Sequence, residues 1–156
     1  MKTYPQRLPM TETALDVFLN EAPIARLGSI NADGTVHLAA LWFKYEGGEI
    51  VIGTQDITRK IRNIKNNPNV TVLIDIEGPP LKGVLIYGQA ELDYEDVVEK
   101  RIDIFRKYMS SERARELATS LADNFKPVII HIKPERISSY DYANEGMIKI
   151  GKKVAE

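Results

Sequence analysis

The sequence contains no cysteine, and this absence removes several classes of chemistry at once. Without cysteine the chain cannot form disulfides, use a thiolate nucleophile or hold zinc through sulfur. It has only two histidines, His37 and His131, and they lie far apart in the sequence, so a histidine metal site is not expected. We therefore predict no metal site, and any redox chemistry has to come from a bound cofactor.

Long apolar runs are also missing. No run approaches the roughly 20 residues that a membrane-spanning helix needs, and the first residues lack the pattern of a signal peptide. The net charge of −1 argues against a general nucleic-acid-binding protein. With 156 residues, of which 44% are hydrophobic and 28% charged, we expect one globular domain over 1–156, located in the cytoplasm and without a membrane partner.

Positive charge is concentrated in one segment, 57–74, which contains no acidic residue. The apolar run 50–52 predicts a strand that leads into this segment, Thr58 suits a helix N-cap, and Asn66-Asn67-Pro68 predicts the end of the helix. Its first residues are then Arg59 and Lys60, which are the unfavourable charge for the positive end of a helix dipole. A phosphate would supply the missing partner, because free N–H groups at a helix start bind anions. The segment 53–62 therefore predicts a phosphate site, and a solvated basic helix face is the alternative interpretation.

Apolar alternation predicts six strands, at residues 24–30, 36–45, 49–54, 70–77, 83–94 and 127–138. Helical spacing predicts a helix after Thr11, the basic helix, and two helices over 95–109 and 110–125. Turns at 33–34 and 46–48 suggest that the first three strands lie side by side. We predict a mainly β fold, a six-stranded antiparallel split β-barrel with flanking helices, and a ferredoxin-like sandwich as the alternative.

Several motifs follow one another in a recognisable order. They are the Trp-Phe strand at 41–45, the strand 48–54 ending in Thr54, the step Thr58-Arg59-Lys60, and Asn67-Pro68 before the next strand. This order and spacing resemble the pyridoxamine 5′-phosphate oxidase-like family of flavin-binding split barrels. The resemblance covers residues 20–95 well and the last strand loosely.

The resemblance implies an FMN-binding oxidoreductase that transfers hydride through the flavin to a small-molecule substrate. It also implies a homodimer with the cofactor between the subunits. Matching positions in the family bind the cofactor phosphate, approach the flavin through the backbone, or line its ring. The implied cofactor-binding residues are Leu41, Trp42, Phe43, Gly53, Thr54, Thr58, Arg59, Lys60 and Gln89. The candidates for reaching the partner's cofactor are Pro79, Lys82, Tyr140 and Asn144.

Other interpretations remain open. The Arg-Leu-His-Asp-Arg segment of the true oxidase is absent from the segment 135–142, so vitamin B6 oxidation is not expected and the substrate is unknown. The extra cations Arg62 and Lys65 would suit the longer anionic tail of the deazaflavin F420. From another class, the chain could be a non-catalytic flavin or haem carrier, with His37 or His131 as haem ligand, or a weak nucleic-acid binder. Neither histidine is predicted to be catalytic, and no catalytic residue is assigned.

Overall fold

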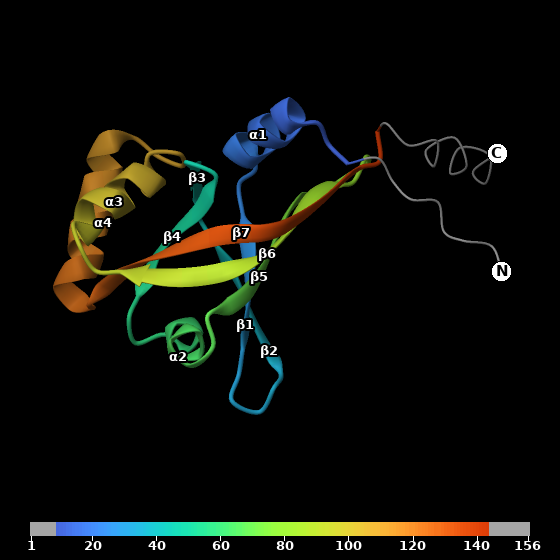
Figure 1. Cartoon of the computed structure of the whole chain (residues 1–156). Coiled ribbons are helices and arrows are strands. Elements are labelled where there is room, and N and C mark those ends of the chain that lie inside the picture. Colours follow the sequence, from blue (N-terminus) through green and yellow to red (C-terminus); the bar gives the residue numbers. More distant parts are fainter. Residues whose placement is uncertain (1–8, 144–156) are drawn as a thin grey trace.

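A computed structural model describes residues 9–143, and their strands form one antiparallel sheet that curls toward a half-barrel (Figure 1). The sheet has seven strands in the order β2-β1-β5-β6-β7-β4-β3. The strands are β1 (Ala25–Ile30), β2 (Val36–Leu41), β3 (Lys44–Glu46), β4 (Glu49–Gln55), β5 (Asn69–Ile76), β6 (Lys82–Asp93) and β7 (Pro127–Asp141). The helices are α1 (Glu12–Glu21), α2 (Arg59–Asn66), α3 (Val97–Phe105) and α4 (Ser111–Asn124).

The mainly β antiparallel fold with flanking helices is confirmed, but the prediction of six strands is wrong by one. The strand predicted over 36–45 divides into β2, which pairs with β1, and β3, which pairs with β4. At the break, the hydroxyl of Tyr108 bonds both the N–H and the C=O of Phe43, at 3.0 and 3.1 Å. The chain therefore leaves one end of the sheet and joins the other at Phe43.

The prediction that the first three strands lie side by side is also wrong. β1 and β2 lie at one end of the sheet, whereas β4 lies near the other and pairs with β7. The turn at 46–48 does form a hairpin, but it joins β4 to the short β3. Long-range pairing of β7 with both β4 and β6 decides this arrangement, and local turn signals carry no information about it.

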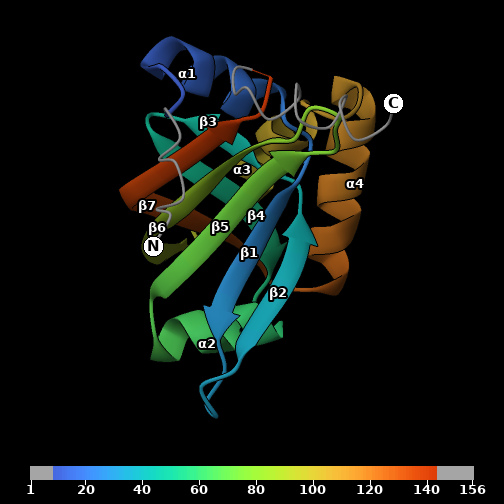
Figure 2. The same ribbon diagram turned by 90° about the vertical axis from the view of Figure 1, so that its right-hand side faces the viewer.

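Two apolar clusters fix the sheet. The larger one lies inside the curl and collects the buried faces of the strands with α1 and α2. The smaller one packs α3 and α4 against the opposite face of β4 and β7, through residues such as Val51, Ile102 and Ile129. Figure 1 shows α3 and α4 together on one side of the sheet, and Figure 2 shows the uncovered outer face of β1, β2 and β5.

The helices begin where the sequence predicts. Thr11 caps α1 by accepting from the N–H of Ala14 at 3.2 Å, and Ser110 caps α4 by accepting from the N–H of Arg113. α2 begins at Arg59 as expected. Within residues 9–143, no helix has the length and apolarity needed to cross a membrane.

Candidate anion site at the start of helix α2

The first turn of α2 carries two cations with no anionic partner. β4 ends at Gln55, a short turn follows, and α2 starts at Arg59. In the described part of the chain neither Arg59 nor Lys60 has an ion pair or a side-chain hydrogen bond, and α2 has no acidic residue in its first turn. The first N–H groups of a helix also lack intrahelical acceptors. This end of the helix therefore holds unneutralised positive charge next to free backbone donors.

Lys60 makes this charge costly. Its side chain is only 8% exposed, and burial lowers the pKa of its ammonium group from the ordinary value. Arg59 is exposed and lies toward the β1–β2 hairpin, where its charge adds a small part to the lowered pKa of Asp33, which is mainly due to hydrogen bonds from Thr35. An anion placed here would meet one exposed and one largely buried cation.

Side-chain hydrogen bonds hold α2 in place on the sheet. The Asn63 amide donates to Ser29 Oγ at 3.1 Å and to Asn31 Oδ1 at 2.9 Å, so the helix is attached to the end of β1. Ile61 and Ile64 bury their side chains in the core inside the curl. The first turn of α2 is thus fixed relative to the sheet before any ligand binds.

Thr58 occupies the N-cap position, but its hydroxyl does not cap the helix. It donates instead to the Gln55 carbonyl at 2.9 Å, which closes the turn between β4 and α2. The expectation of a capping hydroxyl is therefore wrong, because the tight turn gives Thr58 a nearer acceptor. Thr54 points into the core and is buried, so its side chain supports the turn from inside.

The two additional cations of the basic segment differ from each other. Lys65 forms an ion pair with Asp56 at 3.0 Å, and Asp56 also accepts from the hydroxyl of Tyr94. The Tyr94 hydrogen bond first, and the Lys65 pair second, lower the pKa of Asp56. Arg62 is exposed and has no ion pair within residues 9–143. Only Arg62 keeps a charge that is free for a longer anionic tail.

The predicted aromatic strand lies at the break between β2 and β3. Trp42 is 38% exposed, stacks on Tyr108 with ring centroids 4.8 Å apart, and meets Phe105 edge-on at 5.6 Å. Phe43 is fully buried and both its backbone groups bond Tyr108. Leu41 is partly buried against the core. Trp42 is thus the member of this strand with an aromatic surface open to a ligand.

Gly53 faces α3, and the stem of Arg101 lies directly on it. A Cβ at position 53 would be 2.8 Å from Arg101 Cγ, which is too close for any real side chain. The close packing of Arg101 thus favours glycine at this position, and the expected approach of the Gly53 backbone to a flavin stays a prediction. Arg101 was not singled out from the sequence, although its spacing from Val97 and Phe105 places it on the apolar side of α3.

Gln89 lies apart from the first turn of α2. It is exposed on β6, where it pairs with Asn69 at the start of β5, beside the other end of α2. The length of α2 separates the two places by about 12 Å. The structure thus brings Thr58, Arg59 and Lys60 together, places Trp42 and Gly53 near α3, and leaves Gln89 on another part of the sheet.

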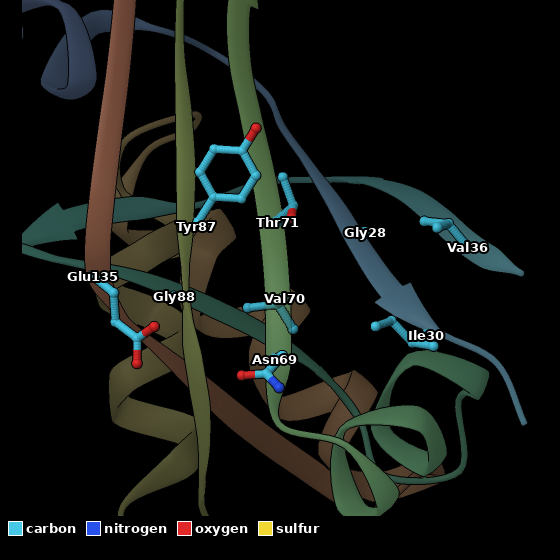
Figure 3. Close-up of a pocket in the computed structure, with 9 residues that line it drawn as sticks. All are labelled: Gly28, Ile30, Val36, Asn69, Val70, Thr71, Tyr87, Gly88 and Glu135. Atoms are coloured by element: carbon cyan, nitrogen blue, oxygen red, sulfur yellow. The ribbon is translucent and has the colours of Figure 1, made fainter. Parts of the chain in front are cut away.

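A groove of about 230 Å³ lies next to Gln89 on the outer face of the sheet (Figure 3). Figure 3 shows Ile30 and Val36 on its apolar side and Asn69 and Glu135 on the polar side, with Gly88 between these two. None of the cofactor-binding residues predicted from the sequence lines it. No local sequence pattern predicts this groove, because the residues that line it come from five separate strands.

The candidates for reaching a partner's cofactor lie at the far end of β5 and β6 from α2 (Figure 1). Pro79 is exposed in the β5–β6 connection, Lys82 pairs with Asp141 at 3.4 Å, and Tyr140 packs over Gly83. Asn144 lies outside the described residues. A strand of eight residues separates this end from α2 by about 25 Å, so these side chains do not meet Arg59 within one chain.

Both histidines lie on strands. The ring nitrogens of His131 contact Glu49 at 3.2 Å and Asp93 at 3.0 Å, so the ring bridges two carboxylates. His37 lies on β2 and is partly exposed. No group of three or more metal-ligating side chains occurs among residues 9–143.

A curled antiparallel sheet with helices packed on it is the architecture of a split β-barrel, and here a basic helix start without an anionic partner lies beside the sheet. The chain belongs to the pyridoxamine 5′-phosphate oxidase family, whose pattern matches residues 11–141. No curated protein matches the chain in sequence.

Solved structures show the same fold. A conserved hypothetical protein from Mycobacterium tuberculosis, Rv2991, is 24% identical with a TM-score of 0.78, over 90% of this chain and 91% of that one. An F420 reductase is 20% identical with a TM-score of 0.63, over 79% and 94% of the two chains. The haem storage protein HutZ from Vibrio cholerae is 18% identical with a TM-score of 0.63, over 87% and 95%. The fold is thus shared by proteins described with different cofactors.

Proposed function

We propose that the chain binds FMN and acts as a flavin-dependent oxidoreductase on a small-molecule substrate. The observation that carries this proposal is Lys60 on the first turn of α2, a residue that is only 8% exposed and has no ion pair within residues 9–143. A buried charge is costly unless it is paired, and a phosphate group would pair it. Bound flavin supplies the hydride chemistry, which is why no catalytic side chain has to be assigned.

The residues of the candidate site divide the work of binding. Arg59, Lys60 and the first N–H groups of α2 bind the phosphate, while Thr58 and Thr54 hold the turn that presents them. Trp42 offers an apolar ring to the isoalloxazine, and Tyr108 fixes the Trp42 side chain by stacking. Gln89 has no role in this division, because it lies on another part of the sheet.

A homodimer is part of the proposal. The outer face of β1 and β2 exposes Val36 by 62% and Leu38 by 70%, and a monomer seldom leaves such neighbouring apolar side chains uncovered. The groove of Figure 3 continues this face onto β5 and β6. In such a homodimer Pro79, Lys82 and Tyr140 are the candidates for reaching the cofactor of the other subunit.

F420 is the second candidate cofactor. Arg62 favours it, because this exposed cation follows the first turn of α2 and has no ion pair within the described residues. Lys65 does not add to this argument, because Asp56 already neutralises it. An F420-dependent reductase would use the same phosphate site and extend its contacts along α2.

The absorption spectrum of the purified protein, titrated with FMN, F420 and haem in turn, tests the proposal. We expect FMN to bind at one site per chain with a perturbed flavin spectrum. Uptake of F420 alone would replace FMN by the second candidate, and uptake of haem alone would indicate a haem carrier. A protein that takes up no flavin, or that binds nucleic acid with a steep salt dependence, would refute the proposed function.

A further inference from the structure

Within residues 9–143 two other cations are enclosed without an anionic partner, one in the middle of α3 and one in the turn after it. Arg101 is 3% exposed, and its Nε and Nη1 atoms have no hydrogen-bond partner. The Nζ atom of Lys107 is also buried and without a hydrogen-bond partner. Both statements concern residues 9–143, and a buried charge without a partner is rare in folded proteins.

The acidic residues nearby are already used by other cations. Asp103 pairs with Lys44 and lies 4.0 Å from Arg106, and Glu99 pairs with Arg115 at 3.1 Å. The positive charge of Arg101 and Lys107 is therefore not cancelled locally.

Each of the two cations contacts a residue for which the family resemblance predicts a place beside the flavin. The stem of Arg101 lies on Gly53, and the Nζ atom of Lys107 lies 3.7 Å above the centre of the Phe43 ring. Phe105 connects Arg101 with Trp42. The centre of its ring lies 5.5 Å from the guanidinium carbon of Arg101 and 5.6 Å from the centre of the Trp42 ring. A flavin ring bound against Trp42 would thus have Arg101 and Lys107 on the far side of the residues that support it.

We propose that Arg101 and Lys107 raise the reduction potential of the flavin bound beside Trp42. A flavin gains negative charge when it is reduced, and enclosed positive charge stabilises that form more than the oxidised one. The low dielectric constant of the protein interior makes a charge effective without direct contact, so the two cations act on the cofactor through the residues that support it. This inference rests on the proposed function, and it adds no step to the reaction.

The midpoint potential of bound FMN, measured by equilibration with a reference dye, tests the inference. We expect Arg101→Met and Lys107→Met each to shift the ratio of reduced to oxidised flavin about tenfold toward the oxidised form, which equals about 30 mV for a two-electron couple. Arg101→Lys keeps the charge and should shift the ratio less than Arg101→Met. Arg115→Met is the matched control, because this exposed cation is already paired with Glu99 and its loss should leave the potential unchanged.

The outcomes separate this inference from the proposed function. If FMN binds the wild type and both methionine variants with the same potential, the inference is wrong and the proposed function stands. If the wild type binds no FMN, both are wrong. Circular dichroism reports whether each variant folds, and Lys107→Met decides the question alone if Arg101→Met does not.

Discussion

Two pairs of cations have no anionic partner within residues 9–143, and the two pairs lie in different surroundings. Arg59 and Lys60 begin α2 at the edge of the sheet, where Arg59 is open to water. Arg101 lies against the ring of Phe105 on α3, and Lys107 lies over the ring of Phe43, which stands between β2 and β3. The Nε and Nη1 atoms of Arg101 and the Nζ atom of Lys107 are buried. Water compensates the charge of Arg59 until an anion binds, whereas Lys60 is largely buried beside it, and we expect this pair to govern the affinity for an anion. An enclosed cation cannot be compensated in this way, and its charge acts on whatever lies nearby.

The largest expected effect concerns the pair at the start of α2, Arg59 and Lys60. The double variant Arg59→Gln with Lys60→Met removes both charges and keeps both stems, and we expect the dissociation constant of FMN to rise about 100-fold or more, because charge-assisted hydrogen bonds contribute about 1.5–3 kcal/mol each. The free energy of unfolding without cofactor should not fall, because Lys60→Met removes a largely buried charge and Arg59 is exposed. Fluorescence titration and urea unfolding measure the two quantities. Unfolding of the variant with FMN affinity retained would show that these cations serve the fold and not an anion.

Tyr108→Phe tests the strand break at Phe43, the residue whose ring lies under Lys107. This substitution leaves the N–H and C=O of Phe43 without their partner, and we expect a loss of about 2 kcal/mol in the free energy of unfolding. Tyr94→Phe is the control. It removes the hydroxyl that donates to the partly exposed side chain of Asp56, and it should cost clearly less. Urea unfolding compares the variants. Equal losses would mean that the bond to Phe43 does not fix the strand break.

Gly53→Ala tests the contact between β4 and Arg101. The added methyl group meets Arg101 Cγ, and we expect a loss of about 1 kcal/mol in the free energy of unfolding. In an Arg101→Ala background the clash is gone, so the same substitution should cost less there. A double-mutant cycle measures this coupling. Additive effects would contradict the close packing of Arg101 on Gly53.

The pH dependence of stability distinguishes the two surroundings more finely. Burial lowers the pKa of Lys107 from 10.5 to about 8 in the folded chain. Between these two values the unfolded chain binds a proton that the folded chain does not, so the free energy of unfolding should rise as the pH increases from about 8 to about 10.5. Urea unfolding at a series of pH values should show this rise in the wild type and a smaller one in Lys107→Met. Parallel curves for the two proteins would argue against a buried ammonium group at this position.

The smallest effect is expected at Lys65. Because Asp56 already pairs with it, Lys65→Gln should change FMN affinity less than twofold. Arg62→Gln is the companion variant, and it should weaken F420 binding if that cofactor is the natural one. A large loss of FMN affinity in Lys65→Gln would place the phosphate farther along α2 than we propose.

The sequence predicts the parts of this fold that depend on local chemistry. Thr11 and Ser110 mark helix starts that the structure confirms. The alternation in β5 predicts a buried face that holds for Val70, Val72 and Ile74, whereas Ile76 at the end of the strand is 36% exposed. The division of the strand at Phe43 was not predictable, because the residue that causes it, Tyr108, is 65 positions away.

The candidate site was predictable to the same degree. The basic start of α2 follows from neighbouring residues, so Arg59 and Lys60 were found. Arg101 was missed, because an arginine in an amphipathic helix is ordinarily solvated and only the packing of α3 on β4 reveals its burial. The residues of the groove in Figure 3 come together only through strand order.

Strand β7 has a consequence for the order in which this protein is made. It lies between β6 and β4, so it alone joins the hairpin of β3 and β4 to the rest of the sheet. During synthesis the ribosome releases β4 long before β7, and the edge of β4 that pairs with β7 has no partner strand until then. Closure of the sheet is therefore expected late, when residues 127–141 emerge.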